Sequence, residues 1–204
     1  MNYLAHAYFS LNNHDWLVGN MISDTVKGRH KFDYSTGIQQ GIALHRLMDT
    51  FTDASPVVKQ AMQILEPGAG RYAGPFIDIA FDYFLANDPA FFPDEESLAK
   101  FAQNVYKVLA IYTKTGFYPA VFERLVSYMR MQNWLFNYRF THGICKSFNG
   151  LTMRAKYLDP RHNSFELFLE NMESLQQLYN AFIPRLSLLV VEWAAVQTPD
   201  PCDF

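Results

Sequence analysis

Cysteine is scarce in this sequence of 204 residues, which holds only Cys145 and Cys202 and no CxxC pair. That usage argues against a disulfide scaffold and favours a reducing compartment. The start of the chain lacks the basic segment that is typical of a signal peptide. The most apolar late stretch, LSLLVVEWAAV, contains Glu192 and is too short to span a bilayer. We therefore expect a cytoplasmic protein with no membrane partner.

The motifs of several common enzyme classes are also missing. The glycines of GAGRYAG (residues 68–74) lack the GxGxxG spacing and follow no strand, so a dinucleotide-binding site is not expected. Neither GxxxxGK(S/T) nor GxSxG occurs, which argues against a P-loop and against the nucleophile elbow of a serine hydrolase. Charge of neither sign is in large excess, because the net charge is −3, and the overall balance selects no class of partner.

Apolar residues, by contrast, are abundant, since half of the chain is hydrophobic and 16% is aromatic. They recur with the spacing of helices, and no alternating run typical of a strand is present. The sequence predicts one all-α domain, a helical bundle over residues 1–204, whose last helix bends or breaks at Pro184. The predicted helices span residues 2–10, 13–27, 36–54, 56–65, 71–87, 94–113, 119–132, 134–142, 147–157 and 164–195.

Acidic residues inside these apolar helices are the most unusual feature. On the helix over 36–54, His45 and Asp49 lie one turn apart among apolar neighbours, and Asp78 and Asp82 are spaced in the same way on the helix over 71–87. Two like charges at that separation repel by about 2–3 kcal/mol at an effective dielectric near 20. A shared proton, a basic partner or a divalent cation relieves such a pair.

Two further polar residues have similar apolar surroundings, Asp24 in GNMISDTVKG and His6 in NYLAHAYF. A mixed histidine and carboxylate set suits Mn²⁺, Fe²⁺, Zn²⁺ or Mg²⁺, and its hard oxygen donors favour Mn²⁺ or Mg²⁺. Simpler explanations stay open: Lys27 pairs with Asp24, Arg46 pairs with Asp49, and a buried histidine binds a backbone carbonyl. An arginine lying across Asp78 and Asp82 would likewise remove the need for a metal.

Positive charge is concentrated between residues 124 and 161, where seven cations face a single acid, Asp159. Aromatic residues are interleaved with them. Such a surface suits an acidic protein or a nucleic acid, and a merely solvated face is the alternative. The cations are Arg124, Arg130, Arg139, Lys146, Arg154, Lys156 and Arg161.

The motifs of the chain resemble those of bacterial acyl carrier protein phosphodiesterases. The resemblance follows the family's order over nearly the whole chain, and the blocks GN…D…KG, GIxLHRxxDxxTD and DxxxD are specific in combination. The matching stretches are MNYLAHAYFS (1–10), LVGNMISDTVKG (17–28), GIALHRLMDTFTD (41–53), RYAGPFIDIAFDYFLA (71–86), NWLFNYR (133–139), NGLTMR (149–154) and FIPRL (182–186).

This resemblance implies an all-helical fold related to the HD-type metal phosphohydrolases. It also implies Mn²⁺-dependent hydrolysis of the phosphodiester that joins 4′-phosphopantetheine to a serine of acyl carrier protein. The residues implied at the metal site are Asp24, His45, Asp49 and Asp78, with Asp82 and His6 close by.

For the mechanism, we expect His6 to protonate the leaving serine and Lys27 and Arg46 to stabilise phosphoryl charge. The basic segment 124–161 would then dock holo acyl carrier protein, not a nucleic acid. The chain has Tyr83 where family members often have histidine. If that histidine is a ligand or a proton donor, the change removes it.

Three other functions remain compatible with these residues. The first is a metal hydrolase that acts on another small phosphoester. The second is a module that binds carrier protein without cleaving it, and the third is a structural helical protein whose acids are paired with arginines. Metal content and turnover of holo carrier protein discriminate among them.

Overall fold

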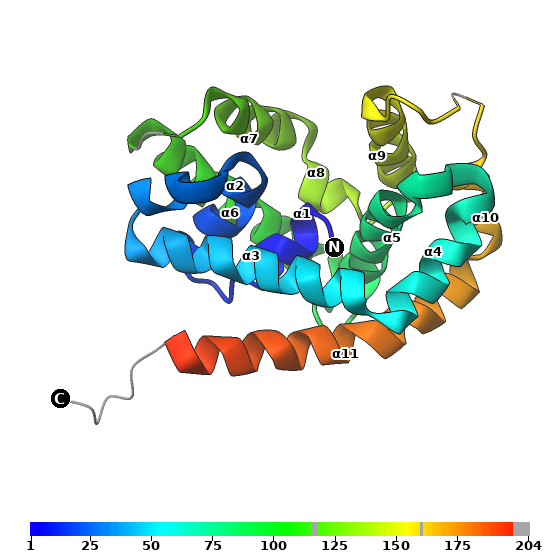
Figure 1. Cartoon of the computed structure of the whole chain (residues 1–204), viewed down its shortest axis with the longest axis horizontal. Coiled ribbons are helices and arrows are strands. Elements are labelled where there is room, and N and C mark those ends of the chain that lie inside the picture. Colours follow the sequence, from blue (N-terminus) through cyan, green and yellow to red (C-terminus); the bar gives the residue numbers. More distant parts are fainter. Residues whose placement is uncertain (116–117, 160, 198–204) are drawn as a thin grey trace.

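The protein is built from helices packed around one core. The computed structural model describes residues 1–115, 118–159 and 161–197, and these contain no strand, so the predicted all-α class is confirmed (Figure 1). Cys202 lies outside the described residues. The α-helices are α1 (Tyr3–Tyr8), α2 (His14–Ile22), α3 (Thr36–Ala54), α4 (Pro56–Ala69), α5 (Ala73–Asn87), α6 (Glu95–Thr115), α7 (Ala120–Gln132), α8 (Trp134–Asn137), α9 (Thr141–Arg154), α10 (Ser164–Glu170) and α11 (Met172–Gln197); the 3₁₀ turns are η1 (Ser23–Thr25), η2 (Gly28–Asp33) and η3 (Gly70–Tyr72).

Helices α2 and α3 approach each other backbone to backbone. A Cβ atom on Gly19 would lie 2.1 Å from the carbonyl oxygen of Ile38, and one on Gly41 would lie 2.3 Å from that of Trp16. Only glycine permits contacts this close between two helices. The pair α2 and α3 therefore forms a rigid unit that holds Asn20 and His45 at neighbouring positions.

Helix α1 is short and is buried in the middle of the molecule, where Figure 1 shows it between α3, α5 and α8. Its residues from Leu4 to Ala7 are all buried. Because six residues form a marginal helix, packing and end contacts must hold it in place. The Asp82 carboxylate on α5 supplies such contacts, because it accepts hydrogen bonds from the backbone N–H groups of Asn2, Leu4 and Ala5.

Helix α11 runs along α3, α4 and α5 at one side of the molecule (Figure 1). The sequence predicts a bend or a break at Pro184, and a break is wrong, because α11 continues through this proline to Gln197. The predicted helix over 164–195 is interrupted at Asn171 instead. Its side-chain amide donates to the carbonyl of Leu167, so the side chain satisfies an end of α10 as asparagine often does.

Two other boundaries differ from the sequence prediction and affect the site. The helix expected over 13–27 ends at Ile22, so Asp24 lies in the turn η1 and is exposed. The helix expected over 147–157 begins earlier, at Thr141, and ends at Arg154. Within the described residues, no helix has the length and apolar content needed to cross a bilayer.

Candidate metal centre

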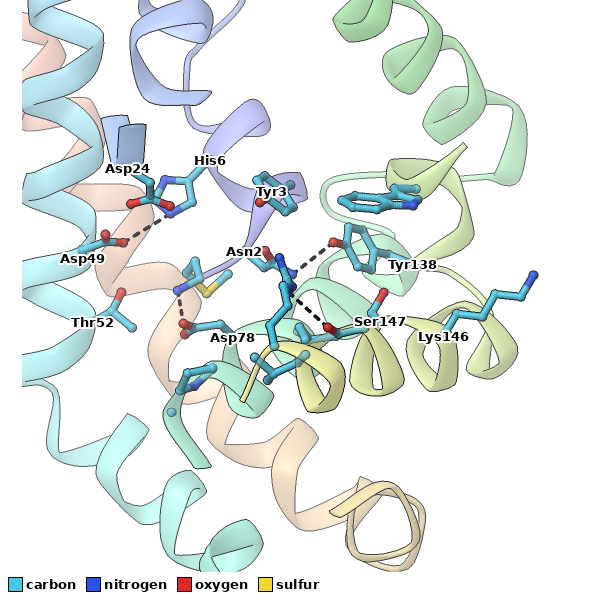
Figure 2. Close-up of a pocket in the computed structure, with 18 of the residues that line it drawn as sticks. Asn2, Tyr3, His6, Asp24, Asp49, Thr52, Asp78, Tyr138, Lys146 and Ser147 are labelled. Carbon is cyan, nitrogen blue, oxygen red and sulfur yellow. Dashed lines mark hydrogen bonds and ion pairs between the residues drawn. The ribbon is translucent and has the colours of Figure 1, made fainter. Parts of the chain in front are cut away.

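A cavity of about 1160 Å³ lies beside the buried α1. Figure 2 shows His6, Asp24, Asp49 and Thr52 on one side of it, and Tyr138, Ser147 and Lys146 on the other. The first group comes from α1, η1 and α3, and the second follows from α8 into α9. Elements distant in sequence therefore build the two walls.

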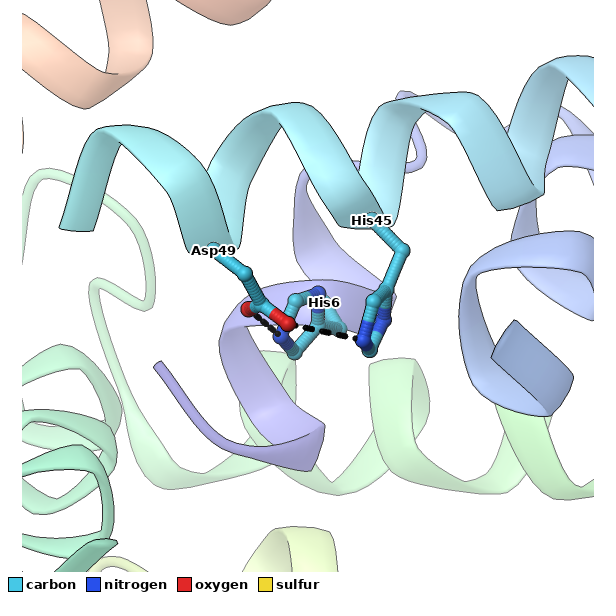
Figure 3. A group of neighbouring side chains, drawn as sticks. All are labelled: His6, His45 and Asp49. Atoms are coloured by element: carbon cyan, nitrogen blue, oxygen red, sulfur yellow. Dashed lines mark ion pairs between the residues drawn. The ribbon is translucent and has the colours of Figure 1, made fainter. Parts of the chain in front are cut away.

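Three side chains on one wall present converging ligand atoms, as Figure 3 shows. Ligand atoms of His6, His45 and Asp49 all lie within 4.8 Å of one another. The Nε2 atom of His6 is 3.3 Å from Oδ1 of Asp49, and Nε2 of His45 is 3.0 Å from Oδ2 of the same carboxylate. The two imidazole rings stack with 4.1 Å between their centroids. Imidazole nitrogens and a carboxylate in this arrangement are a donor set for a divalent transition metal.

Asn20 determines which imidazole nitrogens carry hydrogen. Its Nδ2 donates to the backbone carbonyl of His6, which only accepts, so its Oδ1 must face the rings. That oxygen lies 2.7 Å from Nδ1 of His6 and 3.1 Å from Nδ1 of His45, and this network therefore assigns a hydrogen to both Nδ1 atoms. Both Nε2 atoms are then left to face carboxylates. An outer hydrogen bond of this kind orients histidine ligands in metal sites.

Without a cation, the centre carries its own proton. Burial lowers the pKa of His45, but hydrogen bonds to Asp24 and Asp49 overcome this and raise it to about 9. Burial lowers the pKa of His6, so its Nε2 lone pair faces an oxygen of Asp49. Burial opposes ionisation of Asp49, yet the hydrogen bond with His45 holds its pKa well below the usual range. Two acceptors facing each other fit a cation placed between them, so the residues present suit a bound divalent metal.

Asp24 adjoins this group at the solvent side. Its Oδ1 lies 3.2 Å from Nε2 of His45, and its side chain is 78% exposed. The hydrogen bond with His45 lowers the pKa of Asp24. The structure thus places Asp24, His45 and Asp49 together, as the sequence predicts, and His6, which the sequence predicts as a proton donor close by, lies among the possible ligand atoms.

The family model for acyl carrier protein phosphodiesterase matches residues 1–186 of the chain. The chain belongs to the acyl carrier protein phosphodiesterase family. Proteins of that name from Enterobacter sp. (strain 638) and Yersinia enterocolitica are each 30% identical to it over 186 residues, which cover 91% of this chain and 95% of each relative. The protein of the same name from Klebsiella pneumoniae is 29% identical over 189 residues, 93% of this chain and 97% of that protein. No solved structure gives a significant match.

Family membership confirms the resemblance read from the motifs. It leaves the kinship with HD-type phosphohydrolases as a prediction. The family's DxxxD block is formed here by Asp78 and Asp82, and the structure shows where each of the two acids lies relative to the candidate metal centre.

The two carboxylates of that block lie in different surroundings. Asp78 lines the cavity, and its Oδ1 is 2.8 Å from the amino group of Met1, outside the group of His6, His45 and Asp49. Asp82 is fully buried, does not line the cavity and binds the start of α1. Burial raises the pKa of Asp82 to about 7, and the N–H donors of α1 oppose that rise. The expectation that Asp82 is a metal ligand is therefore wrong: it caps a helix that carries one of the ligands.

Lys27 and Arg46 lie outside the cavity lining. Lys27 is exposed, and Arg46 donates through Nη2 to the carbonyl of Val26. The roles of both at the phosphoryl group stay predictions, and the ion pairs of Asp49 are with His6 and His45, not with Arg46. Tyr83 is also outside the cavity, with its ring edge-on against Phe168. The family position that often holds histidine therefore contributes no ligand here.

Three lysine and arginine side chains also line the cavity. Lys146 and Arg154 come from α9, and Arg71 from η3 lies with its guanidinium 4.4 Å from the ring centroid of Tyr157. The sequence suggests Arg71 only as an arginine that could lie across Asp78 and Asp82, because the basic segment 124–161 does not include it. Within that segment, Arg139 donates to the carbonyl of Ala86 and Arg161 pairs with Asp159, so both have partners in the protein.

Proposed function

We propose that this protein hydrolyses the phosphodiester between 4′-phosphopantetheine and a serine of acyl carrier protein, in a reaction that depends on Mn²⁺ or another divalent cation such as Mg²⁺. The observation that carries the proposal is the convergence of His6, His45 and Asp49 in a cavity whose lining also holds three cations. The names of the relatives give the substrate.

The residues of the chain divide the work between the two parts of the cavity. His6, His45 and Asp49 would hold the ion, with Asp24 beside them, and Asn20 keeps both imidazoles in the orientation a metal needs. The ion, when bound, supplies Lewis-acid polarisation of the phosphoryl group and of water. Arg71, Lys146 and Arg154 supply positive charge for the phosphate and for an acidic partner.

The volume of the cavity fits a substrate with a long arm. A volume of about 1160 Å³ exceeds what a phosphate alone requires. The three cations and the hydroxyl groups of Tyr138 and Ser147 all line the cavity, so its lining offers both charge and hydroxyl groups. This supports phosphopantetheine over a compact phosphoester, which would leave most of the cavity unfilled.

Mass spectrometry of holo carrier protein tests this proposal. With Mn²⁺ present, we expect apo carrier protein and free 4′-phosphopantetheine, no reaction in excess EDTA, and recovery when Mn²⁺ is restored. Binding of carrier protein with no apo product would show a non-catalytic module. Equal turnover of bis(4-nitrophenyl) phosphate would show a general phosphoesterase instead.

The affinity for Mn²⁺ is expected to rise with pH. Since the folded protein holds a proton on His45 up to a pKa of about 9, an ion must displace that proton. Below this pKa the affinity should increase roughly tenfold per pH unit, or about 100-fold from pH 6 to pH 8, and level off above 9. Isothermal titration in two buffers with different protonation enthalpies measures both the affinity and the release of one proton. An affinity that stays constant from pH 6 to pH 8 would contradict this role of His45.

A further inference from the structure

The segment from Lys27 to Phe32 is exposed except for the half-buried Lys31, and burial in the core does not account for its composition. Its turn η2 contains no buried residue. Lys27, Arg29 and Lys31 lie within five positions, and Phe32 is 63% exposed. In the part of the chain that the structure describes, these three cations make no ion pair, and the one pair in the segment joins His30 to Asp33. Unpaired cations around an exposed aromatic ring are more typical of a binding surface than of a structural turn.

The segment begins where the candidate metal centre meets solvent. Asp24, the most exposed acid of the centre, precedes Lys27 by only three residues. The carbonyl of Val26 accepts a hydrogen bond from Arg46, the residue that follows His45 on α3. This contact places the beginning of the segment beside α3. From there the segment returns to Ser35, the N-cap of α3. Arg29 is five residues from Asp24, so the two Cα atoms are separated by at most roughly 17 Å.

We propose that the segment Lys27–Phe32 is a docking surface for the acidic carrier protein, an inference that rests on the proposed function. The bond to be cleaved joins phosphorus to a serine on the carrier, so the carrier's own surface must reach the open side of the metal centre. A standard interface covers about 800 Å² per partner, a patch of roughly 15 Å radius. Such a patch centred near Asp24 reaches Lys27, which by the same limit is at most roughly 10 Å away, and extends toward the rest of the segment.

The chemistry of the segment matches that partner. Carrier proteins of this class are strongly acidic, and three unpaired cations complement them and speed association. Phe32 adds an apolar contact, with Nζ of Lys31 lying 4.9 Å from its ring centroid. This is a different role for Lys27 from the catalytic one that the sequence suggested.

Besides the cations of the cavity, a separate basic surface competes with this segment within the protein. Lys107, Lys114 and Arg130 line a separate groove of about 570 Å³ between α6 and the end of α7. None of its lining residues belongs to the cavity that holds the metal centre. A carrier centred on that groove would not present its serine to His6, His45 and Asp49, so the reaction favours the segment beside Asp24.

Charge reversal in the segment tests the proposal. The double variant Arg29→Glu, Lys31→Glu is expected to weaken binding of fluorescently labelled holo carrier protein at least about tenfold at low salt. The variant Arg29→Lys, Lys31→Arg keeps both charges and should bind like the wild type. As a matched control, Lys107→Glu with Lys114→Glu should change the Kd less than about threefold. Thermal melting of each variant confirms that it is folded.

Binding is measured separately from cleavage, so the two proposals fail separately. The docking surface is refuted if the Arg29 and Lys31 reversal leaves the Kd unchanged, if the groove control weakens binding as much, or if the wild type has no measurable affinity for the carrier. Tighter binding to phosphatidylglycerol vesicles than to the carrier would also overturn it, in favour of a lipid surface. A wild type that binds the carrier through this segment without releasing 4′-phosphopantetheine refutes the proposed function alone.

Discussion

Replacing Asp49 with asparagine is expected to remove Mn²⁺ binding and to lower kcat/KM for holo carrier protein by about a thousandfold or more. Asp49 is the carboxylate that both imidazoles approach, at 3.3 Å from His6 and 3.0 Å from His45. Asparagine has the same shape but no negative charge, so the ion loses its central anionic ligand. Loss of several kcal/mol of transition-state stabilisation corresponds to this reduction in rate.

The variant should still fold, which makes the result interpretable. The side chain of Asp49 is 43% exposed, and the buried His45 keeps Asp24 as a hydrogen-bond partner when Asp49 is replaced. Glu66→Gln, an exposed acid on α4, removes the same charge and should leave both Mn²⁺ binding and kcat/KM within about twofold of the wild type. Calorimetric Mn²⁺ titration and the mass-spectrometric assay supply the two readouts. An Asp49→Asn protein with normal Mn²⁺ affinity would show that the metal lies elsewhere.

The second large effect is expected from Gly41→Ala, which should destabilise the protein by about 3 kcal/mol. The added Cβ would meet only backbone: the carbonyl oxygen of Trp16 at 2.3 Å, Cα of Trp16 at 2.8 Å and Cα of Gly19 at 2.9 Å. None of these atoms moves without separating α2 from α3. For a chain of this size the melting temperature should fall on the order of 10 °C.

A matched glycine separates this steric effect from helix propensity. Gly150 lies in α9 with open space where a Cβ would point, so Gly150→Ala should leave the melting temperature equal or slightly higher. Differential scanning calorimetry measures both variants. Equal melting temperatures for Gly41→Ala and Gly150→Ala would contradict the close contact of the two helices. The same separation would move Asn20 relative to His45, so weaker Mn²⁺ binding should accompany the loss of stability.

The helices were predictable because their signals are local. The start of α3 and its proline-marked end follow from capping residues and periodicity, and its prediction over 36–54 agrees with Thr36–Ala54. The interruption at Asn171 and the continuation through Pro184 were not predictable in the same way. Packing along α3, α4 and α5 holds α11 together across the proline, and such tertiary support has no local signal.

The site was predictable where its residues share one helix face and not where separate segments meet. The spacing of His45 and Asp49 placed them correctly, since residues four apart on a helix are neighbours. The same rule failed for Asp82. The spacing of a DxxxD block does not show which of its two acids binds the start of a helix distant in sequence, because the tertiary fold determines that. The sequence places Asn20 one turn before Asp24 but gives no signal for its contacts with His6 and His45. Those contacts depend on the close approach of α2 and α3.

The binding of Asp82 to the first turn of α1 has a consequence for how the centre is completed. His6 is carried on a helix of six residues whose beginning is held by hydrogen bonds to Asp82 on α5. When the hydrogen bonds between Asp82 and the start of α1 break, His6 can move away from the other candidate ligands. An ion held by His6 would therefore stabilise the folded α1. Unfolding of this helix would in turn weaken ion binding, so the two equilibria are linked.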